Sequence, residues 1–175
     1  MKSWLGLGSN LDQPVAQLRN ALIRLEKAAG IEVLRRSSFY RTPPWGDAQQ
    51  GDFINAVVQI DTGLEPLPLL RVLQSIEDGM GRQRSPRRWG PRLIDIDLLL
   101  YADQTFRTPE LVLPHPRMWE RAFVLLPIFE LDEMLEIPGY GTVRTLLGEL
   151  DISGISRLEE GGRIRGGYFT GADAG

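Results

Sequence analysis

The sequence predicts an α+β fold whose core is a ferredoxin-like βαββαβ sandwich with additional C-terminal helices. Three observations predict it: four apolar segments have strand character, two segments have the helical period, and they follow one another in the order β-α-β-β-α-β. Glycine- and proline-rich turns separate these segments. We expect residues 1–159 to form a single domain and residues 160–175 to form a flexible glycine-rich tail.

The first expected strand is Lys2–Leu7, a short apolar run that ends in a turn containing glycine and serine. The next segment has helical spacing. Asp12 can cap this helix, Pro14 suits its first turn, and Gly30 indicates its end. The residues expected on its apolar face are Val15, Leu18, Leu22 and Leu25.

Two further strands are expected before the midpoint of the chain. Ile31–Tyr40 is one, and Phe53–Ile60 is the other, while residues 42–52 form a loop because they contain two prolines and two glycines. The period of two along Phe53–Ile60 separates two faces. Ile54, Ala56, Val58 and Ile60 share one face, and Phe53, Asn55, Val57 and Gln59 share the other.

The second helix begins after Pro66 and ends near Gly79 and Gly81. Its expected apolar face is Leu69, Val72, Leu73, Ile76 and Met80. Leu93–Tyr101 is the fourth strand, with Ile94, Ile96, Leu98 and Leu100 facing the core. Residues 116–150 are expected to be mainly helical, with breaks at Pro127 and at Pro138 with Gly139.

The composition excludes several kinds of functional site. The chain has 175 residues and no cysteine, which excludes disulfides, zinc–thiolate sites and thiol catalysis. The N-terminal apolar run is too short for a signal peptide, and no stretch has the length of a membrane helix, so we expect a cytoplasmic protein with no membrane partner. The net charge of −3 argues against a general nucleic-acid binder.

Positive charge is nevertheless concentrated in one segment. Residues 82–92 contain five arginines and no acid: Arg82, Arg84, Arg87, Arg88 and Arg92. Because the planar guanidinium group binds phosphate oxygens in pairs, this cluster indicates a phosphorylated small ligand; a solvated loop is the ordinary alternative.

Asp95 and Asp97 give the sharpest chemical indication. The period of two places both on the strand face opposite the core, roughly 6.5–7 Å apart along the backbone. Mg²⁺ prefers carboxylate and phosphate oxygens, so the pair after the arginine cluster favours a metal–phosphate site. A solvent-facing strand edge is the alternative. No phosphate-binding loop motif of the G-x-x-x-x-G-K-[ST] type occurs in the sequence.

Other residues fit a flat heterocycle and a nucleotide. Phe53 beside Asn55 offers a stacking ring and an amide, although a buried aromatic next to an edge asparagine would give the same pattern. Gln74 and Glu77 share a polar helix face, and this face is equally typical of a solvated flank. The remaining candidates, each with an ordinary structural interpretation as well, are His115, the only histidine, Arg117, Arg121 and Trp89.

With these residues assembled, the sequence resembles the 6-hydroxymethyl-7,8-dihydropterin pyrophosphokinases of folate biosynthesis. The segments that carry the resemblance are RWGPRLIDIDLLLY at Arg88–Tyr101, GLGSNL at Gly6–Leu11, SSFYRTPPWG at Ser37–Gly46, FINAVV at Phe53–Val58 and LPHPRMWERAFVLLP at Leu113–Pro127. They stand in the family's order between about residues 3 and 150.

The resemblance implies a reaction, its cofactors and a site. Pyrophosphate would pass from ATP to the pterin hydroxymethyl group, with two Mg²⁺ ions held by Asp95 and Asp97. It implies catalytic roles for Arg82 and Arg92, with residues 82–92 closing over the site as a lid. The implied ATP-binding residues are Gln74, Glu77, Arg84, Trp89, Leu98, Val112, His115 and Arg121. The implied pterin-binding residues are Thr42, Pro43, Pro44, Trp45, Phe53, Asn55 and Phe123.

Two positions depart from the commonest family pattern. Phe53 stands where tyrosine is frequent, and Trp45 stands where leucine can occur. We expect a monomer that acts on small molecules. Two alternatives stay open at this point: a nonenzymatic nucleotide-sensing module and a single-stranded RNA-binding module on the same fold.

Overall fold

A six-stranded antiparallel sheet forms the centre of the molecule in the computed structural model, which describes residues 1–44, 51–81 and 93–158. Five of its strands follow the order β10-β3-β4-β1-β5, and β2 pairs with β4 as well. The elements are β1 Lys2–Ser9, α1 Pro14–Lys27, β2 Ile31–Arg36, β3 Tyr40–Thr42, β4 Phe53–Thr62, α2 Pro66–Gly79, β5 Asp95–Tyr101, β6 Phe106–Arg107, β7 Val112–Leu113, the 3₁₀ helix η1 Met118–Glu120, α3 Ala122–Leu131, β8 Glu136–Ile137, β9 Gly141–Thr142, α4 Val143–Gly148 and β10 Ser156–Arg157.

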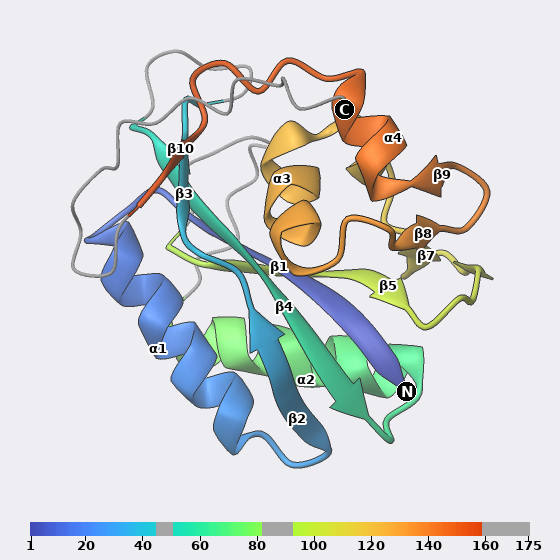
Figure 1. The fold of residues 1–175 in the computed structure, drawn as a ribbon. Helices are drawn as coiled ribbons and strands as arrows, with labels where there is room; N and C mark the ends of the chain where they lie inside the picture. Colours follow the sequence, from blue (N-terminus) through green and yellow to red (C-terminus); the bar gives the residue numbers. More distant parts are fainter. Residues whose placement is uncertain (45–50, 82–92, 159–175) are drawn as a thin grey trace.

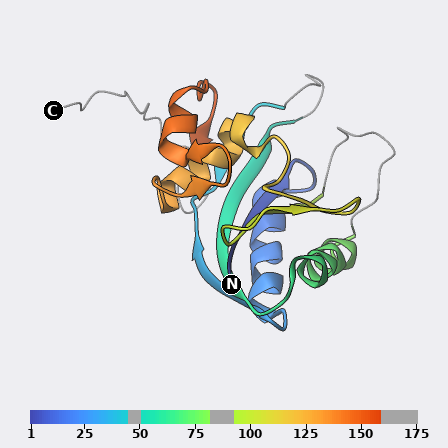
Figure 2. The same cartoon turned by 90° about the vertical axis from the view of Figure 1, so that its right-hand side faces the viewer.

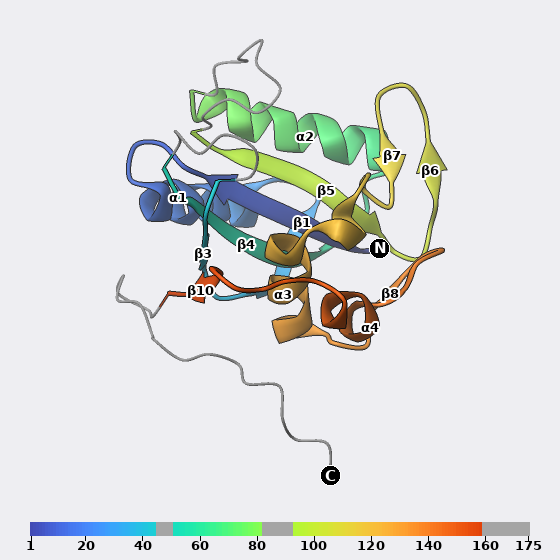
Figure 3. The same ribbon diagram turned by 90° about the horizontal axis from the view of Figure 1, so that it is seen from above.

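Helices cover both faces of this sheet. Figure 1 shows α1 and α2 on one side of the strands and α3 and α4 on the other, and Figures 2 and 3 show the same layers after a quarter turn. The strands pair in an antiparallel manner throughout, so each strand presents alternate residues to the two layers. This arrangement confirms the predicted α+β class.

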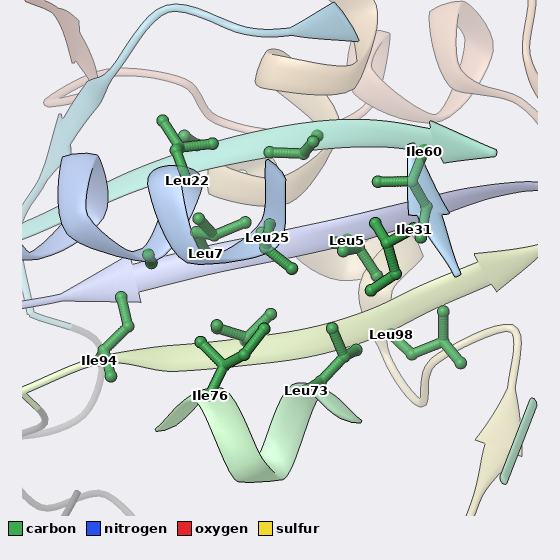
Figure 4. Packing of buried hydrophobic residues seen from close by; sticks show 14 of the residues in the cluster. Leu5, Leu7, Leu22, Leu25, Ile31, Ile60, Leu73, Ile76, Ile94 and Leu98 are labelled. Atoms are coloured by element: carbon green, nitrogen blue, oxygen red, sulfur yellow. The ribbon is translucent and has the colours of Figure 1, made fainter. Parts of the chain in front are cut away.

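Each layer has its own apolar core. On the α1/α2 side, Leu5 and Leu7 of β1 pack with leucines of both helices, and Figure 4 shows these side chains between the helices and the strands. On the α3/α4 side, Trp4, Val57 and Leu99 pack against α3 and α4. Val57 and Val58 are adjacent in β4 and belong to different cores, as the period of two requires.

The predicted strand Ile31–Tyr40 is wrong as one element, because it forms two strands. Both β2 and β3 pair with β4, and the chain leaves the ladder between them. There the Ser37 hydroxyl accepts a hydrogen bond from the Val57 N–H at 2.9 Å, while the Ser37 N–H donates to the Val57 carbonyl. The Ser37 hydroxyl oxygen therefore takes the place of a backbone carbonyl as hydrogen-bond acceptor. This exchange does not alter the alternation of apolar and polar residues, so the sequence pattern could not predict the break.

Three local expectations also need correction. Asp12 does not cap α1, because Gln13, with φ of 60°, occupies the N-cap position and makes no side-chain cap bond. Pro127 does not break α3, which runs from Ala122 to Leu131. A proline at this position removes only the N–H that would bond the Phe123 carbonyl, and the helix continues past it. Leu100 packs in the α3/α4 core rather than the α1/α2 core, because the β1–β5 register shifts between Trp4 and Leu5.

Most of the other expected elements are present, but residues 116–150 are less helical than expected because β8 and β9 form a hairpin between α3 and α4. The strands at Lys2–Leu7 and Phe53–Ile60 extend to β1 and β4, and the helix after Pro66 ends at Gly79. Within the described part of the chain, no helix is long and apolar enough to cross a membrane. Residues 160–175, expected to be a flexible tail, lie outside the described residues.

Candidate functional site

A cavity of about 430 Å³ opens on the α3 side of the sheet, where β1, β4 and β5 lie side by side. Strand residues form its floor, and residues from the loop before η1 and from α3 form its wall. Its lining is Gly6, Leu7, Gly8, Thr42, Pro43, Phe53, Asn55, Ala56, Val57, Asp95, Asp97, His115, Pro116, Arg117, Arg121, Phe123 and Val124.

Two carboxylates lie at the edge of the floor. Asp95 and Asp97 are half-buried and both line the cavity, whereas Ile96 between them is buried in the α1/α2 core. Gly8 and Gly6 stand opposite them on β1. Both glycines line the cavity, and a Cβ atom built on Gly6 would lie 3.3 Å from the Leu99 side chain, so a larger residue there would be crowded.

The opposite side of the floor carries an oriented amide. Asn55 is 8% exposed, and its Nδ2 donates to the Thr42 hydroxyl at 2.8 Å. Gly8 lies between Asn55 and Asp95 in the sheet register, and a Cβ atom built on Gly8 would lie 3.1 Å from the Asn55 Oδ1. Such a distance is tighter than ordinary van der Waals contact, so glycine at this position lets the amide keep its place.

Phe53 of β4 and Phe123 of α3 line the same cavity from the floor and from the helix above it. The sequence separates them by 70 positions, and the packing of α3 on the sheet brings them to one site. An aromatic ring on each side of a cavity that also holds an amide suits a flat heterocycle with polar edges.

The wall near β5 is basic. The backbone N–H of His115 donates to the Leu99 carbonyl at 2.8 Å, which fixes this segment against β5. Arg117 and Arg121 follow on either side of η1; Arg117 forms an ion pair with Glu120 at 2.9 Å, and the Arg121 guanidinium carbon lies 5.9 Å from the centre of the Phe123 ring. Guanidinium groups across from a carboxylate pair suit an anion bridged to those carboxylates by a cation.

His115 is neutral at pH 7. Burial of the imidazole lowers its pKa from 6.5 to about 4, and the positive charge of Arg121 lowers it further than the Asp95 carboxylate raises it. The distance of 3.9 Å between His115 Nε2 and Asp97 Oδ2 is therefore a contact between a neutral ring and a carboxylate and not an ion pair. A neutral imidazole can donate one hydrogen bond to a phosphate oxygen.

Glu77 has a position that sequence reasoning missed. It does not line the cavity, and it is 2% exposed beneath β5. Its Oε1 accepts a hydrogen bond from the Ile96 N–H at 2.7 Å. Among the described strands β5 lies at the edge of the sheet, so this N–H points away from β1, and Glu77 of α2 supplies the acceptor. Glu77 thus stabilises, through this hydrogen bond, the strand that carries Asp95 and Asp97.

The structure brings to the cavity nine of the residues that the family resemblance implies, and the further candidate Arg117 as well. The nine are Asp95, Asp97, Thr42, Pro43, Phe53, Asn55, His115, Arg121 and Phe123. Five others do not line it: Pro44, Gln74, Glu77, Leu98 and Val112. Five lie outside the described residues, together with the proposed lid: Arg82, Arg84, Trp89, Arg92 and Trp45. Their roles stay predictions. Gly8 belongs to β1 and not to the turn predicted after Leu7, and the alternation of glycine with leucine in GLGS matches a strand whose one face carries no side chains.

The donor set suits Mg²⁺ shared with a ligand. Mg²⁺ in nucleotide sites takes one or two carboxylates from the protein and its other oxygens from phosphate and water. Asp95 and Asp97 supply this number at the open edge of the cavity, and within residues 1–44, 51–81 and 93–158 no group of three or more potential ligands could hold a metal alone. The residues therefore fit a metal bound together with phosphates.

Comparisons with known proteins agree with this geometry. A family model described as 7,8-dihydro-6-hydroxymethylpterin-pyrophosphokinase matches residues 4–133. A 2-amino-4-hydroxy-6-hydroxymethyldihydropteridine pyrophosphokinase of Methylorubrum extorquens is 51% identical over 158 residues, which cover 90% of this chain and 99% of the relative. The protein of the same name in Haemophilus influenzae is 41% identical, over 83% of this chain and 90% of its own length.

A solved structure of Plasmodium falciparum HPPK-DHPS with pteroate matches with a TM-score of 0.73 at 16% identity. The match covers 93% of this chain and 47% of that one, so this chain spans about half of the Plasmodium protein. At that identity the likeness concerns the fold. The family model and the two bacterial relatives decide membership: the chain belongs to the 7,8-dihydro-6-hydroxymethylpterin-pyrophosphokinase family.

Proposed function

We propose that this protein transfers the pyrophosphoryl group of ATP to the hydroxymethyl group of 6-hydroxymethyl-7,8-dihydropterin, giving the pterin diphosphate and AMP in folate biosynthesis. The observation that carries the proposal is the single cavity in which a carboxylate pair lies beside an amide and two phenylalanine rings. One half suits a metal-bound polyphosphate and the other suits a pterin, so the two reactants would meet at Gly8.

In this reaction the hydroxymethyl oxygen attacks the β-phosphorus of ATP. The bond from that phosphorus to the oxygen bridging the α-phosphorus breaks, AMP leaves with this oxygen, and the hydroxymethyl proton is released. Little covalent chemistry falls to the protein, whose main work is to align the groups and to offset the charge of the phosphates. The described residues support that role because the carboxylate pair would hold one reactant and the amide with the two phenylalanine rings would hold the other.

Each side chain has a part in the alignment. Asn55, held by Thr42, would pair with the pterin edge, while Phe53 and Phe123 would stack on its faces. Arg121 and the neutral His115 would bind phosphate oxygens.

Asp95 and Asp97 would hold Mg²⁺, with two ions as the proposed number. When bound, Mg²⁺ supplies charge neutralisation on the phosphates. Arg82 and Arg92, whose catalytic roles follow from the family resemblance, would add positive charge to the same region.

We also assign the core to the ferredoxin-like fold. The four main strands occur in the order β2-β4-β1-β5, each pair is antiparallel, and α1 and α2 lie on one face. This is the arrangement that two interleaved βαβ units produce, and it supports the assignment.

The test is an incubation of the protein with ATP, Mg²⁺ and reduced hydroxymethylpterin, followed by separation of the nucleotides. We expect AMP to form only when the pterin is present. ADP in place of AMP would indicate an ordinary kinase, and ATP binding without turnover would favour a nucleotide-sensing module. Binding of single-stranded RNA in preference to the pterin would favour the RNA-binding alternative.

A further inference from the structure

Glu130, near the end of α3, lies at the centre of a polar cluster outside the cavity. Its Oε2 accepts hydrogen bonds from the Ser38 N–H and the Tyr40 hydroxyl, both at 2.9 Å, and its Oε1 accepts one from the Ser38 hydroxyl at 2.8 Å. Arg157 completes the cluster, with 3.0 Å from its Nη2 to Glu130 Oε1 and 2.7 Å from its Nε to the Ser38 hydroxyl. One carboxylate thus joins α3, β3 and β10.

Glu130 is the only polar residue of α3, whose sequence is AFVLLPIFEL. The buried side chains by which this helix packs on the sheet are apolar and include Val124, Leu125 and Ile128. Apolar burial is non-directional and tolerates small shifts of a helix along a sheet, whereas hydrogen bonds fix both distance and angle. The position of α3 along β3 therefore depends on Glu130 more than on its apolar neighbours.

The elements joined by Glu130 are the elements that bound the aromatic half of the cavity. Phe123 precedes Glu130 by seven residues, nearly two helical turns, so both project from the same side of α3. On β3, Tyr40 and Thr42 share one face by the period of two, and Thr42 holds the Asn55 amide. The same face of α3 therefore carries Glu130 and Phe123, and the same face of β3 carries Tyr40 and Thr42. The Glu130–Tyr40 bond lies at one end of these two faces, and the cavity lies at the other.

Two further observations show that this end of α3 is fixed. Arg35 of β2 donates from Nη1 to the Leu131 carbonyl at 2.8 Å and from Nε to Gln59 at 2.9 Å. The Tyr40 side chain is 5% exposed, and burial together with the Glu130 carboxylate raises the pKa of its hydroxyl above the ordinary value, so it stays a donor.

We propose that Glu130 is a positioning residue for the pterin: by binding Ser38 and Tyr40 it sets the gap between α3 and the β3–β4 floor into which the flat ring fits. The proposal rests on the proposed function for the identity of the ring. Glu130 touches no reactant. Its loss would shift Phe123 relative to Asn55 and weaken pterin binding, while Asp95 and Asp97 on β5 would keep their geometry.

The experiment compares Glu130→Ala, Glu130→Gln and Tyr40→Phe in the full chain. Glutamine keeps an acceptor for the Ser38 N–H and the Tyr40 hydroxyl and loses the charge that pairs with Arg157, so it serves as the conservative variant. Glu133→Gln is the matched control, because Glu133 pairs with Arg144 at 2.5 Å near the same helix end and has no bond to β3 in the described part of the chain.

Two quantities are measured for each variant: the pterin dissociation constant, by calorimetry with Mg²⁺ and a non-hydrolysable ATP analogue, and the KM values for both substrates. For Glu130→Ala we expect pterin binding to weaken about tenfold, since a misplaced positioning element costs a factor of this order or more. Glu130→Gln and Tyr40→Phe should lose less. In Glu130→Ala the KM for ATP should rise by less than the pterin dissociation constant.

Unchanged pterin binding in Glu130→Ala, an equal loss for ATP, or the same loss in Glu133→Gln would overturn the proposal. If Glu130→Ala does not fold, Tyr40→Phe decides alone, since it removes a single hydrogen bond to Glu130. Wild-type protein that binds the pterin but forms no AMP would sink the proposed function and leave the positioning role to be judged on the dissociation constants. Wild-type protein that does not bind the pterin would overturn both.

Discussion

At the scale of single residues, Asp95 and Asp97 owe their position to the two-residue period of β5. Ile96 is buried between them, so both carboxylates reach the cavity together. The same period on β4 brings Phe53 and Asn55 to one face. These residues could be named from the sequence because a strand period is a local property.

Replacement of Asp97 by alanine is expected to abolish AMP formation and leave the fold intact. The carboxylate side chain is 40% exposed at the cavity and contributes little to the core. Steady-state turnover and thermal unfolding would be measured side by side. Asp103→Ala, which removes an exposed acid just beyond β5, is the control, and normal activity in Asp97→Ala would contradict a metal site at these residues.

His115 is expected to titrate near pH 4 in the folded protein, which the chemical shifts of its ring protons would report. Since the folded pKa lies below the ordinary 6.5, the unfolded chain binds more protons between pH 4 and 6.5. Stability therefore rises with pH across this window and is lost as pH falls from 6.5 to 4, by up to about 3 kcal/mol.

Urea unfolding of His115→Gln at pH 4.5 and pH 7 isolates the contribution of the imidazole. The stability of the wild type relative to the variant should be higher at pH 7 than at pH 4.5. A difference that is the same at both values would show that His115 keeps its ordinary pKa in the fold.

Alanine in place of Gly8 is expected to weaken pterin binding about tenfold without unfolding the protein, because the new Cβ would press on the Asn55 amide. Gly148→Ala is the matched control, since a Cβ there meets nothing within 4 Å. Pterin affinity would be measured by calorimetry for both. Equal affinities in the two variants would mean that pterin binding does not depend on the present position of the Asn55 amide.

At the scale of elements, β5 depends on a neighbouring helix. It is an edge strand, and Glu77 of α2 accepts the Ile96 N–H on its open side. Glu77→Ala should lower the free energy of unfolding by about 1–3 kcal/mol, the range for a buried donor left without its acceptor. It should also weaken binding of Mn²⁺, a probe for the Mg²⁺ site, because Asp95 and Asp97 flank Ile96.

Glu77→Gln is the companion variant, because its amide oxygen can still accept this hydrogen bond. Urea titration gives the stability of both variants, and calorimetry gives the Mn²⁺ affinity. If the glutamine variant lost as much stability as the alanine variant, the carboxylate charge rather than the Ile96 hydrogen bond would be the important feature.

At the scale of the whole molecule, the C-terminal part of the described chain returns to the first half. Ser156 and Arg157 pair with β3, and Leu158 is buried while its N–H donates to the Phe39 carbonyl at 2.8 Å. Deletion of residues 160–175 is expected to leave activity and stability unchanged, in line with the predicted domain boundary. Deletion from residue 156 should lower the melting temperature and raise the pterin KM, because it removes Arg157 and Leu158.

Thermal unfolding and steady-state kinetics of the two truncated chains would check this expectation. Equal behaviour of the two chains would show that the pairing of β10 with β3 contributes nothing. A large loss in the shorter deletion would move the functional boundary beyond residue 159.

The sequence by itself determined the α+β class, the order of the main elements, the family resemblance and nine of the residues that line the cavity, because periodicity, turn residues and motifs are local in the chain. The tertiary structure alone decided the division of residues 31–42 into two strands, the burial of Glu77 under β5 and the tie of Glu130 to β3. Each of these depends on a partner at least 11 positions away, and no pattern within one segment reports a partner that only folding brings near.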